Sequence, residues 1–322
     1  MKTLGRYIFL FVVAPLVVFS SACFFGEEKK NDPSGLEGSI TVSGAFALYP
    51  LMVKWGEEFR KIHPNVKFNI SAGGAGRGIS DVIGNLGDLA LVSRDLKKPE
   101  KERGAFPIAV TKDAVLPTIN ASNPNINEIL QRGISKESFY KLFIENSVSD
   151  WQQLGFAISS KTHVYTRSDA AGAAESWAKY LGKKQEDLEG VGVFGDPGLL
   201  QAVLKDANAV GYNNIGYVFD LKTKQPLQGV KIIPIDINGN GVLDAEENFY
   251  SNLDSLLSAI SVGKYPSPPA RDLFFVTHHK PTNKLLVEFI KWVLTSGQQY
   301  VASSGYVAFS KEKLEEELEK LK

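Results

Sequence analysis

Strand-like and helix-like segments alternate along this chain, and that order constrains the fold more than any other feature. The segment 39–42 has the composition of a strand, and Leu51, Trp55 and Phe59 follow it at helical spacing. Pro64 then ends the helical pattern. Alternation of this kind is typical of α/β proteins, in which helices cover mostly parallel sheets. We therefore expect an α/β fold with mostly parallel sheets flanked by helices.

The same patterns predict the remaining elements. The 285 residues from 38 to 322 exceed a typical single-core domain, so we expect two lobes. The extended runs at 108–120 and 273–277 are candidates for crossings between them, and the charged helix at 311–322 is expected to be a solvated face. The expected strands are at 66–71, 89–92, 108–120, 163–166, 215–218, 230–235 and 273–277, and the expected helices at 79–83, 135–144, 172–181, 285–294 and 311–322.

The N-terminus predicts export. Two basic residues precede an apolar run at 7–19 that is too short to span a bilayer, which is typical of a secretory signal. Cys23 is the only cysteine, so no intrachain disulfide can form. Its position resembles the lipobox of bacterial lipoproteins, although Ser20 stands where leucine is usual. That resemblance implies a signal peptide at 1–22, lipidation of Cys23 and a tether at 23–37.

The charge balance argues against one class of partner. The chain has 36 basic and 36 acidic residues, whereas a nucleic-acid-binding protein requires a basic surface. No segment of 18 apolar residues follows the run at 7–19. We therefore expect a protein that is anchored to a membrane without crossing it and that does not bind nucleic acid.

A glycine cluster at 72–79 lies between an expected strand and an expected helix. Glycines there let the backbone turn tightly and direct successive N–H groups toward one point. The helix start adds partial positive charge, so the turn is a candidate anion cradle. It lacks the Lys-Ser/Thr ending of a P-loop and the acidic residue of a dinucleotide fingerprint, and an ordinary strand-to-helix turn is the alternative.

Four segments together resemble the phosphate-binding proteins of bacterial ABC importers, and the match runs over nearly the whole mature chain. The segments are 44–51, 73–78, 88–96 and 167–173, with shorter echoes at 214–218, 291–294 and 305–307.

This resemblance implies a two-lobed periplasmic-binding-protein-like fold with a ligand cleft between the lobes. Lobe I would comprise 38–115 and 275–322, and lobe II would comprise 116–274. The implied function is that of a lipid-anchored, monomeric solute-binding protein in the bacterial cell envelope. It would capture phosphate or a related oxyanion outside the cytoplasm and deliver it to an ABC permease.

The resemblance also implies which residues hold the anion. Their loops lie next to strand ends or helix starts and can supply N–H donors, and Arg167 can add a guanidinium fork. The implied residues are Gly44, Ala45, Phe46, Ala47, Gly74, Ala75, Gly76, Arg77, Ser93, Arg94, Arg167, Asp169, Ala171, Gly172 and Ala173.

The chain departs from the family at hydroxyl positions in these loops. Side chains without a hydroxyl stand at Ala45, Phe46, Ala47, Ala75, Ala171 and Ala173. Each missing donor to a charged acceptor is worth ~1–3 kcal/mol. Arg77 and Arg94 would offset this loss with positive charge, and Asp95 would stand in for the family aspartate that repels sulfate. The identity of the oxyanion stays open.

A second motif, at 236–247, matches the EF-hand calcium loop. Gly241 provides the sharp turn, and the strand expected before the loop argues for a structural clamp rather than a sensor. We expect calcium to raise the melting temperature, and the alternative is an Asn/Gly-rich turn without metal. The predicted ligands are Asp236, Asn238, Asn240, the Val242 carbonyl, Asp244 through water, and Glu247.

Two other functions remain open: an enzyme that acts on phosphate esters, and a binding or adhesion module on the same fold. None of the four histidines, His63, His163, His278 and His279, stands in a metal-ligand or triad pattern, and no serine lies in a Gly-x-Ser-x-Gly elbow. We therefore expect no catalysis.

Overall fold

The computed structural model describes residues 34–322. The predicted signal peptide at 1–22, Cys23 and most of the predicted tether lie outside the described residues. Within 34–322, no helix combines the length and the apolar character needed to cross a membrane.

Strands and helices alternate, and the predicted α/β class is confirmed. The strands are β1 (Gly38–Gly44), β2 (Val66–Ala72), β3 (Leu89–Val92), β4 (Ala105–Asn120), β5 (Ile134–Ser135), β6 (His163–Arg167), β7 (Val191–Val193), β8 (Ala209–Asn214), β9 (Val230–Ile232), β10 (Ile235–Asp236) and β11 (Ala270–His278). The α-helices are α1 (Tyr49–Ile62), α2 (Ala75–Ile83), α3 (Lys98–Glu102), α4 (Ile126–Arg132), α5 (Lys136–Phe143), α6 (Gly172–Tyr180), α7 (Gly195–Lys205), α8 (Leu253–Ser261), α9 (Lys284–Leu294) and α10 (Lys311–Glu319). The 3₁₀ helices η1 (Phe46–Leu48) and η4 (Ile215–Tyr217) also matter for the site.

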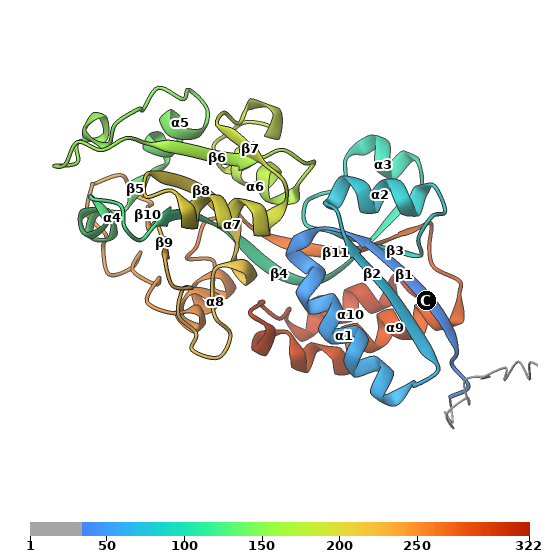
Figure 1. Ribbon diagram of the computed structural model, residues 1–322. Coiled ribbons are helices and arrows are strands. Elements are labelled where there is room, and N and C mark those ends of the chain that lie inside the picture. The colour runs from blue at the N-terminus through green and yellow to red at the C-terminus, as the bar shows by residue number, and fades with distance from the viewer. Residues whose placement is uncertain (1–33) are drawn as a thin grey trace, which may run out of the picture. The chain divides into compact units, whose positions relative to one another are not determined.

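One large sheet has the strand order β2-β1-β3-β11-β4-β8-β6-β7, with β9 paired to β4. The pairs at its two ends are parallel, namely β1 with β2 and β3, and β6 with β7 and β8. Between them, β11 runs antiparallel to β3 and β4, and β4 runs antiparallel to β8 (Figure 1). The long strands β4 and β11 therefore connect the two parallel groups.

Two hydrophobic cores lie on either side of this connection. One contains buried residues between 36 and 110 and between 273 and 321. The other contains residues between 114 and 270, together with Val307. All described residues nevertheless belong to one compact unit, so the predicted lobe boundaries stay a prediction.

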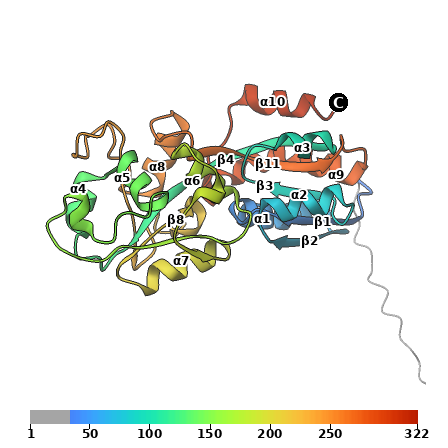
Figure 2. The ribbon, with the colours of Figure 1, turned by 90° about the horizontal axis from the view of Figure 1, so that it is seen from above.

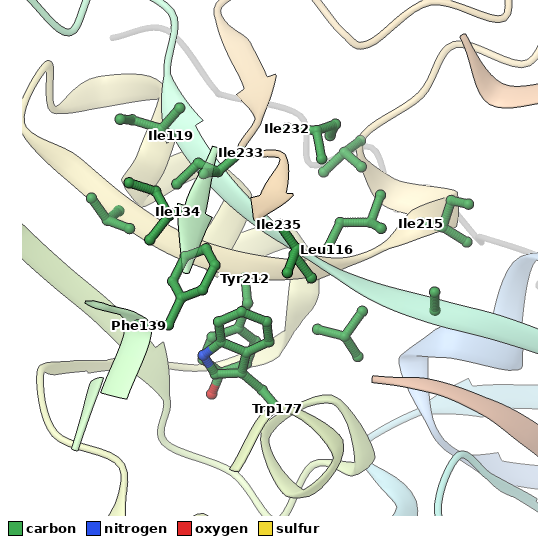
Figure 3. Close-up of a cluster of buried hydrophobic side chains, with 14 of the residues drawn as sticks. Leu116, Ile119, Ile134, Phe139, Trp177, Tyr212, Ile215, Ile232, Ile233 and Ile235 are labelled. Carbon is green, nitrogen blue, oxygen red and sulfur yellow. The ribbon is translucent and has the colours of Figure 1, made fainter. Parts of the chain in front are cut away.

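The second core fixes α6, the helix whose start faces the candidate site. Trp177 of α6 is fully buried, and its ring meets Phe139 edge-on at 5.0 Å and stacks on Tyr212 at 5.9 Å. Figure 3 shows these rings beside Ile134 and Ile235, which come from the paired strands β5 and β10. Aromatic packing of this kind holds the helix in one orientation.

Three expectations about local structure were wrong. The segment expected as a strand at 215–218 forms the 3₁₀ helix η4, which follows directly from β8. The expected strand at 230–235 is divided: β9 pairs with β4, whereas β10 pairs with β5, and Pro234 between them has no N–H to continue a ladder. Helix α2 begins at Ala75, inside the glycine cluster.

Helix α10, at the top of the view in Figure 2, is not a purely solvated face as expected. Glu317 is 1% exposed, and its carboxylate accepts a hydrogen bond from the Ala109 N–H at 2.9 Å. Lys313 and Lys320 both pair with the same carboxylate, so the buried charge is neutralised.

Candidate anion-binding site

The four predicted loops meet at one hollow between β1, β3, β6 and β8. Its empty volume is about 160 Å³, and it is too narrow to accept a water molecule. A tetrahedral oxyanion can therefore enter only if the surrounding segments move apart. The lining residues are Ala45, Phe46, Ala47, Gly74, Ala75, Ser93, Arg167, Ala171, Gly172, Ala173, Asp196 and Asn214.

Three helix starts line this hollow. They belong to η1, α2 and α6, whose N-cap residues are Ala45, Gly74 and Ala171. No side chain caps any of the three. The first N–H groups of a helix have no partner within the helix, so an uncapped start offers donors and partial positive charge to an anion. The alanines that replace hydroxyls thus leave the main-chain donors in place.

Glycine is required at two points in the wall. Gly74 has φ +87°, a conformation that residues with a Cβ rarely adopt. A Cβ on Gly172 would lie 2.2 Å from the Ser93 Oγ and 2.5 Å from the Ser93 carbonyl oxygen. The loop after β3 and the start of α6 therefore approach each other as closely as a residue without a side chain permits.

Gly44 and Gly76, also predicted for the site, lie just behind the lining. The Gly44 carbonyl accepts the N–H groups of Gly73 and Gly74 at 2.9 and 3.0 Å. The Gly76 N–H lies 3.5 Å from the Ala170 carbonyl oxygen, which places α2 against the loop that leads into α6.

Arg167 is buried at the end of β6 between two carboxylates. Its Nε and Nη2 donate to the two oxygens of Asp169 at 2.8 and 2.6 Å, and its Nη1 donates to Asp196 at 2.6 Å. Burial alone would lower the Arg167 pKa, but the charge of Asp196 and the bonds to Asp169 outweigh burial and raise it. Three of the five N–H groups of the guanidinium are thus already donated, and two remain for a ligand.

The fixed charges beside the hollow sum to about one negative charge, because Arg167 faces both Asp169 and Asp196. Asp196 is fully buried, and its second oxygen accepts the Asn214 N–H at 3.1 Å. The hollow therefore offers main-chain donors together with a carboxylate acceptor, a combination suited to an anion that still carries a proton.

Phe46 covers the hollow on one side. Its ring lies 5.4 Å from the Arg167 guanidinium carbon and meets Phe194 edge-on at 5.9 Å. The Tyr217 hydroxyl donates to the Phe46 carbonyl at 3.0 Å, and burial raises the Tyr217 pKa, with the Asp196 charge adding to the effect. An apolar ring over the guanidinium excludes water and strengthens the ion pairs beneath it.

Two arginines predicted for the site lie outside the hollow. The Arg77 side chain is 59% exposed and lies 3.5 Å from Asp81 on its own helix. Arg94 is buried, but its guanidinium forms two hydrogen bonds with Glu100 and lies 3.4 Å from Glu175. Neither guanidinium faces the hollow, because each is directed to a nearby carboxylate outside it.

Asp95, predicted to repel sulfate, lies outside the hollow as well. Its side chain is 76% exposed and pairs with Lys179 at 2.9 Å. Asp95 and Arg94 instead line a separate cavity with Lys112 and Asp272.

Sequence reasoning missed four polar residues around the hollow. Asp196 and Asn214 line it, and behind them Arg271 of β11 pairs with Asp113 of β4 at 2.9 Å. Arg271 also donates to the carbonyl of Gly172 at 2.5 Å and to the side chain of Asn214. Burial raises the Asp113 pKa, although the Arg271 charge opposes the shift. Adjacent charged residues inside each of the two crossing strands, Lys112-Asp113 in β4 and Arg271-Asp272 in β11, were the signal that could have revealed this pair.

The predicted calcium loop begins at β10, well separated in sequence from the hollow. Within residues 34–322, no three His, Cys, Asp or Glu side chains are gathered into a ready-made metal cluster. Half of the loop's predicted ligands are two asparagine side chains, Asn238 and Asn240, and the main-chain carbonyl of Val242. An EF-hand site therefore does not depend on acidic side chains alone.

Comparison with known proteins identifies similar sequences and similar structures. Residues 31–296 match a family model described as the PBP superfamily domain. The "Phosphate-binding protein PstS" of Bacillus subtilis (strain 168) is 27% identical over 236 residues, which cover 70% of this chain and 76% of that protein. The protein of the same name from Pseudomonas aeruginosa PAO1 is 26% identical, covering 85% of this chain and 84% of that protein.

Solved structures show the same fold. A structure from Clostridium perfringens with bound phosphate, assigned as a phosphate ABC transporter substrate-binding protein, has a TM-score of 0.69 at 21% identity and covers 85% of this chain and 100% of that chain. An ABC-type phosphate transport receptor from Vibrio cholerae has a TM-score of 0.61 at 20% identity, covering 84% and 100%.

Proposed function

This chain belongs to the PBP superfamily, and on that premise we propose that it is a solute-binding protein that captures phosphate or a closely related oxyanion for an ABC importer. The observation that carries the proposal is the convergence of three uncapped helix starts on a hollow that also holds Arg167 and Ser93. Main-chain donors of this kind bind oxyanions without any particular side chain. The names and bound ligand of the relatives support the same choice of ligand.

Capture requires movement, because the hollow is too narrow for the ion as it stands. Strands β4 and β11 connect the two hydrophobic cores, so rotation about them would open and close the hollow. Closure over the ion excludes water, which strengthens each hydrogen bond. The permease would then receive the closed, loaded form.

The acidic character of the hollow favours phosphate over sulfate. Near neutral pH phosphate retains a proton that it can donate to Asp196, whereas sulfate has no proton and would face the carboxylate directly. The relevant carboxylate is Asp196 rather than Asp95, because Asp196 lines the hollow and Asp95 lies outside it. One hydrogen bond to a charged group is worth about 1.5–3 kcal/mol, roughly a ten- to hundredfold difference in affinity.

Calorimetric titration of the ligand-stripped protein near pH 7 tests both statements. Phosphate is expected to bind at one site per chain, at least about tenfold more tightly than sulfate. Molybdate, which is larger, is expected to bind more weakly than phosphate. Equal affinities for phosphate and sulfate would exclude the role of Asp196, and no binding of any of the three ions would exclude the function.

The absence of histidine from the lining favours capture over ester hydrolysis. His163 pairs with Asp206, and His278 contacts Asn85 away from the hollow. A turnover assay with a chromogenic phosphate ester separates the two functions, and we expect no phosphate release above the rate of the buffer.

We also propose that Cys23 carries the lipid that holds the protein on the outer side of a membrane. Its support is the sequence around it, a basic start and an apolar run that precede the lone cysteine. Substitution of Cys23→Ser is expected to move the protein from the membrane fraction to the soluble fraction. Mass spectrometry of the mature N-terminus provides the direct check, and an unmodified cysteine on membrane-bound protein would contradict the assignment.

A further inference from the structure

We propose that the loop 236–247 binds one calcium ion, at a site separate from the oxyanion hollow. The loop matches an EF-hand loop at each ligand position. A motif alone does not make a site, and the argument rests on what the structure does with its last ligand, Glu247.

Glu247 is buried with half of its carboxylate unused. The residue is 5% exposed, and its Oε1 accepts hydrogen bonds from the N–H groups of Ile237 and Asn238 at 2.9 and 3.1 Å. Its Oε2 is buried and has no hydrogen-bond partner among the described residues. A buried, unpaired carboxylate oxygen is costly, and native structures seldom leave one without a partner. The EF-hand glutamate at this position uses both oxygens on the metal, which would supply that partner.

The first ligand is held equally firmly. Asp236 is 3% exposed, and its carboxylate accepts the N–H groups of Gly239 at 2.8 Å and Gly241 at 2.9 Å. Both glycines have positive φ, which lets the chain wrap around the carboxylate. These bonds and the two glycine turns thus wrap the loop around the Asp236 carboxylate.

The charges of the loop are not balanced by protein cations. Among residues 34–322, no lysine or arginine pairs with Asp236, Asp244 or Glu247. Asp244 instead accepts the side-chain amides of Asn238 and Asn240 at 2.8 and 2.9 Å. The side-chain oxygens of Asn238 and Asn240 each accept a main-chain N–H of the loop at 2.9 Å, and each keeps a second lone pair that a cation can use. A divalent cation would neutralise the carboxylates and complete the coordination of Glu247.

The site would act as a clamp on neighbouring structure. Strand β10 pairs in parallel with β5, with Asp236 opposite Ser135. The Leu243 N–H donates to the Gln131 carbonyl at 3.1 Å, and the side chain of Leu243 packs against the second core. Calcium would therefore fasten the loop to the end of α4 and to β5, so its effect should appear in stability, independently of oxyanion binding.

The experiment is calorimetric titration of the chelator-treated full-length protein with calcium chloride, with thermal unfolding measured in parallel. We expect one calcium per chain, a higher melting temperature with calcium, and weaker binding of magnesium, which demands a tighter octahedral site. If a water molecule and not a metal satisfies Glu247, adding calcium up to millimolar concentration will produce no heat of binding and no shift in melting temperature. That result would overturn the proposal.

Paired variants make the test specific. Glu247→Gln is expected to weaken calcium binding at least about tenfold, since even substitutions behind metal ligands cost that much. Glu246→Gln removes the same charge from the next position, which is exposed and is not a predicted ligand, and should leave calcium affinity unchanged. Asp244→Asn, at a less buried position, should weaken binding without preventing folding. If the Glu246 and Glu247 variants lost calcium affinity equally, the effect would come from the general charge of the loop, and the site would be excluded. Phosphate titration of each variant verifies that the rest of the protein is intact.

Discussion

Substitution of Arg167→Gln is expected to lower both stability and oxyanion affinity. The change leaves Asp169 and Asp196 buried side by side without their shared cation. Removing one partner of a buried ion pair costs about 3–5 kcal/mol, which corresponds to a fall in melting temperature of roughly 10 °C in a protein of this size. The two unpaired carboxylates would also repel an incoming anion. We expect phosphate affinity to fall at least about a hundredfold, or roughly 3 kcal/mol.

Arg77→Gln is the matched control, because it makes the same chemical change in helix α2, whose start lines the hollow. The Arg77 side chain is exposed and pairs with Asp81, an arrangement worth about 0–1 kcal/mol. Differential scanning calorimetry and phosphate titration of both variants provide the comparison. If the Arg77 variant lost as much affinity as the Arg167 variant, the site would not be the hollow described above.

Substitution of Gly172→Ala is expected to weaken oxyanion binding while leaving the fold intact. The added Cβ would lie 2.2 Å from the Ser93 Oγ and 2.5 Å from the Ser93 carbonyl oxygen, so the two segments must separate. Donors from the start of α6 and from Ser93 could then no longer reach the same small ion. We expect phosphate affinity to fall at least about tenfold, the effect of losing one hydrogen bond to a charged group. Overpacking of this kind costs about 1–3 kcal/mol, and the helix preference of alanine over glycine, about 1 kcal/mol, offsets part of that cost. The melting temperature should therefore fall by only a few degrees.

Gly87→Ala is the control for this substitution. A Cβ at Gly87 would meet its nearest neighbour, the Thr41 carbonyl oxygen, at an ordinary 3.5 Å. Phosphate affinity of the Gly87 variant should equal that of the unmodified protein. Unchanged phosphate affinity in the Gly172 variant would show that the close approach to Ser93 plays no part in binding.

Local patterns were sufficient to predict most of the fold. Hydrophobic spacing located α1 and α9, and the extended runs located β4 and β11, because each pattern reflects contacts within a single element. The failures fell where tertiary contacts decide. A short apolar run such as 215–218 suits several conformations, and its conformation depends on β8 before it.

The site divides in the same way. The backbone of the predicted loops lines the hollow, since glycine turns and helix starts are visible in sequence. Side-chain direction is not visible: Arg77 and Arg94 point to carboxylates that only the folded chain brings near them. Asp196 lies 29 positions from Arg167 along the chain, and no local pattern links the two residues.

The uncapped helix starts have a consequence for how such a protein changes over generations. A binding contact made by the main chain persists as long as the backbone conformation is kept, whichever side chain that position carries. Natural variation can therefore replace hydroxyls by alanines here and leave ligand capture standing, provided that no substitution adds bulk at Gly74 or Gly172. Selection would act on side-chain size and backbone conformation at these positions more than on the identity of the other residues.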